Sequence, residues 1–242
     1  MKKETIVLLP GYDGDGQGTF AKLTSLIEGK YDCLIINYPF YRQTTKSYSL
    51  SELNQWLQRV IKAKHLAKFH LLGFSMGGFI ATQYAISHPE QILSLTIVSS
   101  SVSPSLSSSY NTLVWTARNL FKVPLIAKVF SIIYTLKLLK PLVTKYSPLP
   151  LPRDDFPSSE GYPVYGTLAN VLYEATHNDQ DQLIAKQKFP KLAILFKDDH
   201  SFPASTYAPI LTNFGFRVIV KERGGHAVSN NYWNQVASSL YR

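Results

Sequence analysis

Six short apolar segments recur along this 242-residue chain, and stretches of helical length separate most of them. The segments are apolar throughout rather than at alternate positions, which is typical of parallel strands buried on both faces. Strands that alternate with helices predict an α/β fold, in which helices cover both faces of a mostly parallel sheet of about six strands. The expected strands are Thr5–Pro10, Cys33–Tyr38, Phe69–Gly73, Leu95–Ser99, Leu192–Phe196 and Val218–Lys221. The expected helices are Gly18–Ile27, Ser49–Lys62, Met76–Ser87, Ala204–Asn213 and Asn231–Tyr241.

The alternation is interrupted once, between about Val102 and Asp181. This segment contains two apolar and basic helical candidates, the second bounded by Pro124 and Pro141, because proline opens a helix readily and ends one inside it. The strand pattern then resumes without a new start. We therefore expect one domain, with residues 1–101 and 182–242 as its core and residues 102–181 as a helical cap inserted between two strands.

Composition narrows the class of protein. A chain that is 45% hydrophobic and 17% charged favours a folded domain with a sizeable core over a disordered chain. The single cysteine, Cys33, excludes a disulfide within the chain and a cysteine-based zinc site. Neither a signal-peptide core nor an apolar run of roughly 18 residues is present, so we expect a cytoplasmic protein without a transmembrane segment.

The segment Gly73-Phe74-Ser75-Met76-Gly77 fits the pattern G-x-S-x-G and stands between an expected strand and an expected helix. A serine at such a position lies on a tight, strained turn that pushes its hydroxyl out of the sheet. Glycine two residues to either side lets the strand and the helix approach closely. The helix N-terminus favours negative charge that develops beside the hydroxyl. We therefore predict that Ser75 is a nucleophile.

A serine nucleophile needs a base to take its proton, and the chain holds six histidines. His226 follows Gly224-Gly225 just after the last expected strand. A loop with two glycines can fold over the sheet edge and deliver the imidazole to Ser75, so we predict that His226 is the base. We expect the other histidines to be solvated or structural, and these are His65, His70, His88, His177 and His200.

The base in turn needs a carboxylate that holds its tautomer and stabilises the imidazolium. Asp198 and Asp199 both follow the expected strand Leu192–Phe196, at the edge where Ser75 should emerge. Their spacing does not decide cleanly between them. We favour Asp199, because the pattern D-x-x-x-P then places Pro203 at the start of the next helix.

The oxyanion of a tetrahedral intermediate needs hydrogen-bond donors, and each one removed costs about 3 kcal/mol of transition-state stabilisation. The first expected donor is the backbone N–H of Met76, the residue after the nucleophile. The second should come from the loop after the first strand, where Gly11 lets the chain turn. From its position in that loop, we assign this donor to the N–H of Tyr12.

The same loop partly matches two ligand-binding patterns. Asp13-x-Asp15-x-Gln17 is like the start of a calcium loop, but its twelfth position is Thr24 rather than glutamate, and no helix precedes it. Gly14-x-Gly16-x-Gly18 is like a dinucleotide loop, but the third glycine comes one residue early, and the acidic residue expected about twenty residues on is missing. We therefore predict neither a metal site nor a cofactor.

In chain order, these motifs resemble those of the α/β-hydrolase superfamily: P-G-x-x-G after the first strand, G-x-S-x-G, D-x-x-x-P and G-G-H. The resemblance runs from Thr5 to the end, apart from the inserted segment. It implies the α/β-hydrolase fold and a serine hydrolase with a triad of Ser75, Asp199 and His226. The sequence departs from the superfamily at Pro10, where histidine is common, and we expect it to lack the superfamily's first two strands.

The inserted segment is strongly basic. Between Glu90 and Asp154 the chain has seven basic residues and no acidic one, against a net charge of +9 for the whole chain. Such a field attracts an anionic partner, and salt weakens the attraction. We expect an acidic carrier protein, an anionic membrane surface or a negatively charged small substrate, and no nucleic acid. The basic residues are Arg118, Lys122, Lys128, Lys137, Lys140, Lys145 and Arg153.

The inserted segment is also apolar along one broad helical face. Most of these side chains should pack on the body of the protein, and a minority should line an apolar acyl pocket over Ser75. They are Leu113, Trp115, Leu120, Phe121, Leu125, Ile126, Val129, Phe130, Ile133, Leu136 and Leu139.

The motifs and the resemblance together predict a serine-dependent hydrolase that cleaves a carboxylic ester through an acyl-enzyme. In outline the chain is also similar to biotin-pathway esterases, which free pimeloyl-carrier protein from its methyl ester using a basic cap surface. A pimeloyl-acyl-carrier-protein methyl ester esterase, a thioesterase acting on an acyl carrier protein and a carbon–carbon bond hydrolase therefore stay as alternatives. An alternative of another class is a hydrolase-fold binding protein with negligible turnover.

Overall fold

The computed structural model describes residues 3–41, 46–104, 108–120, 161–226 and 229–240. These residues form a six-stranded sheet in the order β2-β1-β3-β4-β5-β6, and every neighbouring pair of strands is parallel. The prediction of a parallel sheet of about six strands is confirmed. The strands are β1 (Glu4–Leu9), β2 (Tyr31–Ile35), β3 (Phe69–Phe74), β4 (Ile92–Val98), β5 (Lys191–Phe196) and β6 (Arg217–Lys221).

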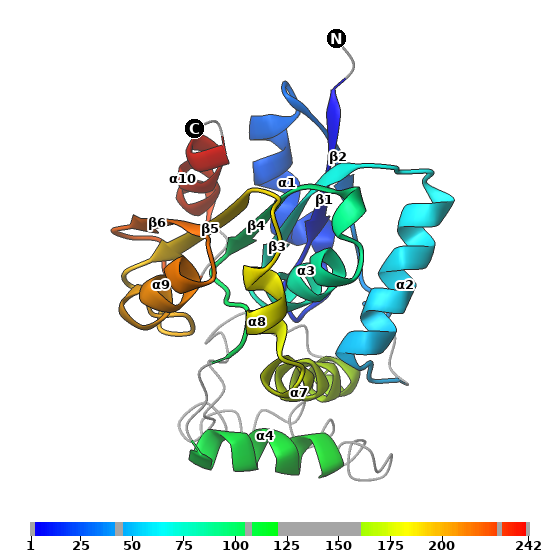
Figure 1. Ribbon diagram of the computed structural model, residues 1–242, viewed down its shortest axis with the longest axis vertical. Coiled ribbons are helices and arrows are strands. Elements are labelled where there is room, and N and C mark those ends of the chain that lie inside the picture. The colour runs from blue at the N-terminus through cyan, green and yellow to red at the C-terminus, as the bar shows by residue number, and fades with distance from the viewer. Residues whose placement is uncertain (1–2, 42–45, 105–107, 121–160, 227–228, 241–242) are drawn as a thin grey trace.

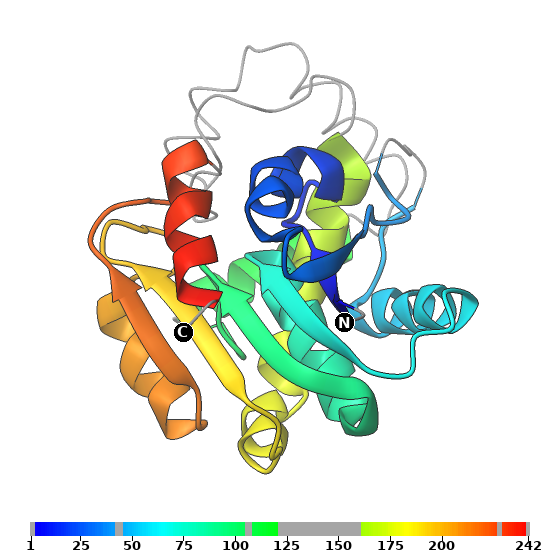
Figure 2. The same cartoon turned by 90° about the horizontal axis from the view of Figure 1, so that it is seen from above.

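Helices cover both faces of the sheet (Figures 1 and 2). Helices α1 (Gly16–Ile27) and α10 (Asn230–Leu240) pack against one face. Helices α2 (Leu50–Ala63), α3 (Met76–Ser87) and α9 (Ala204–Asn213) pack against the other. Each face has its own buried apolar cluster, so the strands are buried on both sides, as their continuous apolar sequences predict.

The helix ends follow the local chemistry of the sequence. Ser49 is the N-cap of α2: its hydroxyl accepts from the Glu52 N–H at 3.0 Å, and the Glu52 carboxylate accepts from the Ser49 N–H at 2.9 Å. The expected strand Cys33–Tyr38 stops earlier, at Ile35. The Ile36 N–H still donates to Leu8 O of β1, but the Tyr38 N–H donates to Gly14 O in the loop after β1.

The inserted segment between β4 and β5 contributes α4 (Ser108–Leu120), α7 (Gly161–His177) and α8 (Gln180–Ala185). Helix α7 packs against α4, α2 and α3, and α8 packs against α3. Helices α7 and α8 are not among the helices predicted from the sequence. The second predicted helix of the segment, between Pro124 and Pro141, lies outside the described residues, and the limits of the cap stay a prediction.

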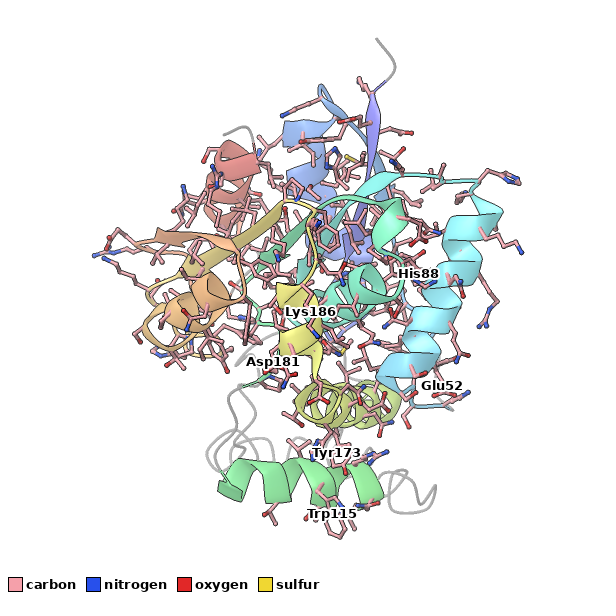
Figure 3. All side chains as sticks on the ribbon, in the orientation of Figure 1. Glu52, His88, Trp115, Tyr173, Asp181 and Lys186 are labelled. Atoms are coloured by element: carbon pink, nitrogen blue, oxygen red, sulfur yellow. The ribbon has the colours of Figure 1, made fainter. Side chains whose placement is uncertain are left out.

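Few of the basic and apolar side chains of the inserted segment are described. Of the seven basic residues only Arg118 is, with its guanidinium 4.1 Å from the centre of the Tyr173 ring. Trp115 and Leu120 are 54% and 45% exposed, so neither is buried against the body of the protein. Figure 3 shows Tyr173 between α7 and α4, and Trp115 on the outer side of α4. Within the described part of the chain, no helix is long and apolar enough to cross a membrane.

Candidate active site

The candidate site lies where β3, β4 and β5 end. Because the sheet is parallel, the carboxyl ends of its strands meet at one edge. The loops after these strands begin with Ser75, Ser99 and Lys197, respectively.

Ser75 occupies a strained turn between β3 and α3, with φ 53° and ψ −123°. Its N–H donates to Val98 O at 3.0 Å, which ties the turn to the end of β4. A Cβ at Gly73 would overlap the backbone of Gly77, and a Cβ at Gly77 would overlap the carbonyl oxygens that follow β1. The glycines of the G-x-S-x-G pattern are therefore required by close backbone approach.

The structure brings the three side chains predicted for the site together. Ser75 Oγ lies 2.9 Å from His226 Nε2, and His226 Nδ1 lies 3.0 Å from Asp199 Oδ2. Ser75 is 7% exposed and Asp199 1% exposed, whereas the imidazole of His226 retains 23% exposure. The hydrogen-bonded chain is thus mostly removed from solvent, with one partly open side.

The environment of Asp199 holds its carboxylate ionised. Burial by itself would raise the pKa of Asp199, but the hydrogen bond and charge of His226, the Phe202 N–H and the Ser99 hydroxyl outweigh it, so the pKa lies below its usual value. The N–H groups of Ser201 and Phe202 donate to Oδ1 at 2.8 and 3.0 Å. An ionised carboxylate only accepts hydrogen bonds, so Nδ1 of a neutral His226 carries the proton and Nε2 can accept from the Ser75 hydroxyl.

Asp198, the alternative acid, points to a different partner. Its carboxylate accepts from Gly224 N at 3.0 Å and from Gly225 N at 2.8 Å. Gly225 has a φ of 59°. Asp198 therefore anchors the glycine loop that carries His226, whereas Asp199 contacts the imidazole itself.

Two aromatic rings flank the imidazole of His226. The ring centres of Phe74 and Phe202 lie 5.3 and 5.6 Å from that of His226, at interplanar angles of 30° and 23°. Contact with both rings restricts rotation of the imidazole and keeps its two nitrogens directed at their partners.

The two predicted oxyanion donors belong to segments that adjoin Ser75. Met76 is the first residue of α3, and the first N–H groups of a helix have no carbonyl partner within it. The loop after β1 approaches Ser75 closely: a Cβ built on Gly11 would lie 3.7 Å from Ser75 Cβ. Tyr12 follows Gly11, and its N–H stays the predicted second donor.

Hydroxyl groups at the end of β4 also support this site, and the sequence motifs do not predict them. Ser100 Oγ donates to Ser75 O at 2.7 Å and so braces the strained turn. Ser99 lies beside Asp199 and accepts from Tyr232. The available signal was the run Ser99-Ser100-Ser101 directly after a strand that ends at the same edge.

A second serine–histidine–carboxylate set lies elsewhere in the sheet. His70 Nδ1 is 2.8 Å from Ser94 Oγ, and His70 Nε2 is 3.0 Å from Glu4 Oε2. These residues belong to β3, β4 and β1, respectively, so Ser94 sits within a strand rather than on a turn before a helix. The set therefore lacks the strained turn and the helix N-terminus that adjoin Ser75.

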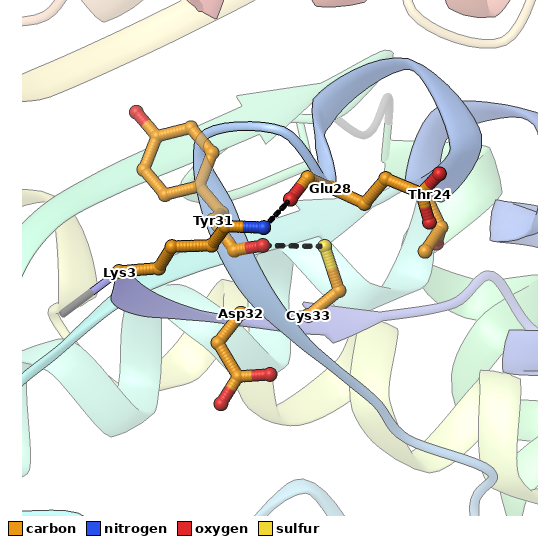
Figure 4. A pocket seen from close by; sticks show the side chains of 6 residues that line it. All are labelled: Lys3, Thr24, Glu28, Tyr31, Asp32 and Cys33. Carbon is orange, nitrogen blue, oxygen red and sulfur yellow. Dashed lines mark hydrogen bonds between the residues drawn. The ribbon is translucent and has the colours of Figure 1, made fainter. Parts of the chain in front are cut away.

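A surface pocket lies at the opposite edge, beside the start of β2 (Figure 4). Lys3 Nζ donates to Glu28 O there, and the Cys33 thiol contacts Tyr31 O at 4.0 Å. Since strand β2 begins at this edge, the pocket is separate from Ser75. Among the described residues, no cluster of three or more His, Cys, Asp or Glu side chains is arranged to hold a metal ion. The pocket is lined by Lys3, Thr24, Glu28, Tyr31, Asp32 and Cys33.

Asp13, in the loop that carries Tyr12, holds an unfavourable charge. Burial raises the pKa of Asp13 from 3.8 to about 6; the Asp15 N–H opposes this increase, and the Asp15 charge adds to it. A carboxyl group whose pKa is raised in the folded state reduces stability as the pH rises from the unfolded pKa through the folded one. Ionised Asp13 therefore destabilises the fold above about pH 6.

We expect Asp13→Asn to raise the free energy of unfolding at pH 8 by on the order of 2 kcal/mol, with allowance for the part of the side chain that solvent reaches. Asparagine keeps the acceptor for the Asp15 N–H without the charge. The gain should shrink as the pH falls towards 4. Urea denaturation at pH 4.5 and pH 8 measures it, with exposed Asp32→Asn as the matched control. An equal effect of Asp13→Asn at both pH values would contradict the prediction.

Known proteins that resemble this chain include hydrolases of several kinds. A family model described as alpha/beta hydrolase fold matches residues 4–131. A pimeloyl-[acyl-carrier protein] methyl ester esterase from Aeromonas hydrophila is 30% identical over 96 residues, which cover 40% of this chain and 37% of that protein. A 2-hydroxy-6-oxononadienedioate/2-hydroxy-6-oxononatrienedioate hydrolase from Klebsiella pneumoniae is 33% identical over 104 residues, which cover 40% of this chain and 36% of that protein. The matches span less than two fifths of each relative's length.

Solved structures extend the likeness to nearly the whole chain. A thermophilic esterase from Thermogutta terrifontis matches with a TM-score of 0.74, covering 99% of this chain and 89% of that chain at 14% identity. An identity this low shows the fold alone.

Proposed function

This chain belongs to the α/β-hydrolase fold family, and we propose on that premise that it is a serine hydrolase that cleaves a carboxylic ester through an acyl-enzyme intermediate. The observation that carries the proposal is the hydrogen-bonded chain from Ser75 through His226 to Asp199, with contacts of 2.9 and 3.0 Å. Nucleophile, base and acid come from three separate loops, and this order of contacts is the one that acyl transfer requires.

In the acylation step, Ser75 Oγ attacks the ester carbonyl carbon while its proton passes to His226 Nε2. Asp199 holds the Nδ1 proton and stabilises the imidazolium that forms. The tetrahedral intermediate collapses as its bond to the alcohol oxygen breaks, and the imidazolium gives its proton to that oxygen. The products of this step are the alcohol and an ester of Ser75.

Deacylation repeats the sequence with water. His226 takes a proton from water as the water oxygen attacks the acyl carbon. The second intermediate collapses as its bond to Ser75 Oγ breaks, the imidazolium of His226 returns the proton to Oγ, and the carboxylic acid leaves. In both steps the backbone N–H groups of Met76 and Tyr12 donate to the oxyanion. The position of Met76 at the start of α3 and the approach of Gly11 to Ser75 support these donors.

The inserted segment is the proposed source of substrate specificity. We infer that residues 102–181 form a cap and that its apolar side chains line an acyl pocket. The contacts of α7 with α2 and α3 support this arrangement, since α3 begins beside Ser75. The basic residues of the segment would attract an anionic substrate or carrier.

A methyl ester or thioester carried by an acyl carrier protein is the second candidate substrate. The Aeromonas hydrophila relative, named for pimeloyl-[acyl-carrier protein] methyl ester, favours it, together with the net charge of +9. The rate of hydrolysis of such a substrate should fall as the salt concentration rises, whereas the rate for an uncharged ester should not change.

The proposal is tested with a fluorophosphonate probe and a p-nitrophenyl ester series of increasing acyl length. We expect covalent labelling of Ser75, found by peptide mass mapping, and multiple turnover of at least one ester. Ser94→Ala is the matched control and should label like the wild type, because Ser94 lies within β4 and has neither the strained turn nor the helix N-terminus that adjoin Ser75.

Two results would contradict the proposal. Labelling without turnover of simple esters, carrier-bound esters or thioesters would indicate a binding protein of the hydrolase fold. Labelling that survives Ser75→Ala and disappears in Ser94→Ala would place the reactive serine in the other set.

A further inference from the structure

Three consecutive serines, Ser99, Ser100 and Ser101, follow β4 at the edge that holds Ser75, and all three are fully buried. A buried hydroxyl is unfavourable unless it is hydrogen-bonded. Ser100 braces the Ser75 turn, and Ser101 Oγ has no hydrogen-bond partner among the described residues. Ser99 differs from both, because its hydroxyl connects two other elements.

Ser99 stands between Tyr232 on α10 and Asp199 after β5. The Tyr232 hydroxyl donates to Ser99 Oγ at 2.8 Å, and this contact is buried. The Ser99 hydroxyl also lies close enough to the Asp199 carboxylate to lower the pKa of that carboxyl group. Because Ser99 Oγ accepts the tyrosine proton, its own proton remains available to the carboxylate.

The backbone at Ser99 is unusual for a serine. Its φ is 45°, a left-handed conformation that side chains other than glycine and asparagine adopt at a cost of about 1 kcal/mol. Its N–H donates to Ile194 O at 2.9 Å, which fixes the turn to β5. A serine at such a position, where glycine would be easier to accommodate, points to a use for its hydroxyl.

The Tyr232 ring is held rigidly. It stacks on Phe196 with ring centres 4.4 Å apart and meets Phe74 edge-on at 5.8 Å. Burial raises the pKa of Tyr232 well above its usual value, so the hydroxyl keeps its proton. Phenylalanine would fill the same space as Tyr232. Packing therefore explains the aromatic ring but not the hydroxyl group.

Resting on the proposed function, we propose that Ser99 and Tyr232 are positioning residues for the hydrolytic reaction. Together they form a buried hydroxyl relay, Tyr232 to Ser99 to Asp199, that fixes the acid carboxylate in its orientation towards His226. The relay supplements the two backbone N–H groups that donate to Asp199 Oδ1. It acts through Asp199 and touches neither substrate nor the reacting atoms.

Two substitutions test the relay. Tyr232→Phe removes only a hydroxyl, and Ser99→Gly removes a hydroxyl while relieving the left-handed backbone. We expect each to lower kcat about 10- to 100-fold with little change in KM, which is the range for one lost hydrogen bond to a charged group. The acid limb of the pH–kcat profile should move to higher pH, because a carboxylate that loses a donor takes up a proton more readily.

A double-mutant cycle separates positioning from structural support. In an Asp199→Asn background, Tyr232→Phe should cause no further loss of activity, because the group through which it acts is gone. Ser101→Ala is the matched control: it removes a buried serine hydroxyl that lies outside the relay, and it should leave kcat and the pH profile unchanged. Thermal unfolding of every variant verifies that it is folded.

The failures of the relay and of the proposed function are distinguishable. If the wild type turns over esters but both relay variants stay within twofold of it with unshifted pH profiles, the relay is wrong and the proposed function stands. Losses that persist in full in the Asp199→Asn background would also overturn the relay. A wild type without turnover would remove the proposed function, on which the relay rests.

Discussion

Replacement of Ser75 by alanine is expected to lower kcat on the best p-nitrophenyl ester by roughly 10⁵- to 10⁶-fold, close to complete loss. The reason is chemical: no other described hydroxyl lies against His226 Nε2, and alanine leaves no atom to form the acyl-enzyme. Steady-state kinetics measures the loss, and absence of fluorophosphonate labelling confirms its cause. Retention of more than about a hundredth of the activity would contradict the assignment of Ser75 as nucleophile.

Because the backbone at Ser75 is strained, substitutions at this position should also change the stability of the fold. With φ 53° and ψ −123°, the turn disfavours any residue with a Cβ. We therefore expect Ser75→Gly to be inactive yet more stable than Ser75→Ala, by about 1 kcal/mol in urea denaturation. If the inactive glycine variant is the more stable one, the strain at Ser75 serves the function of the protein and not its folding.

Asp199→Asn is expected to lower kcat by about 10⁴-fold while leaving the protein folded. The asparagine amide can donate to His226 Nδ1, which would move the imidazole proton to Nε2. Nε2 would then be unable to accept from Ser75 Oγ, although the 2.9 Å contact is retained. Steady-state kinetics with a single ester measures the loss, and KM should change little.

Asp198→Asn is the matched control for this prediction. Its carboxylate touches the backbone N–H groups of Gly224 and Gly225 rather than the imidazole, so its effect is limited to the position of the loop. We expect a loss of about tenfold or less. If Asp198→Asn proved far more damaging than Asp199→Asn, Asp198 would be the acid and the observed contact of His226 would not be the functional one.

The order of the strands and helices was predictable because it depends on local pattern. Apolar runs that are continuous, such as Leu192–Phe196, need burial on both faces, and only a covered parallel sheet supplies it. The limits of α3 and α9 matched the prediction at both ends. In contrast, α7 was missed, because it lies in an insertion where the alternation of strand and helix gives no guide.

Some residues of the candidate site were likewise predictable from the sequence and others were not. The turn at Ser75 was predictable because its pattern is local: a strand, two glycines and a helix. The hydroxyl relay was not, since Tyr232 is a core residue by its apolar ring and only its contact with Ser99 distinguishes it. The residues around Ser99 and around Tyr232 form no pattern that predicts a contact between the two.

From the order of residues alone come the sheet, its covering helices and the turn that presents Ser75, because each depends on side chains that are neighbours along the chain. Tertiary structure decided which of two adjacent carboxylates meets His226 and which hydroxyls support it. Asp198 and Asp199 differ by a single position, yet one faces a glycine loop and the other an imidazole. The local pattern D-x-x-x-P favours Asp199 without excluding Asp198, because the contact itself depends on how loops from separate strands pack at one sheet edge.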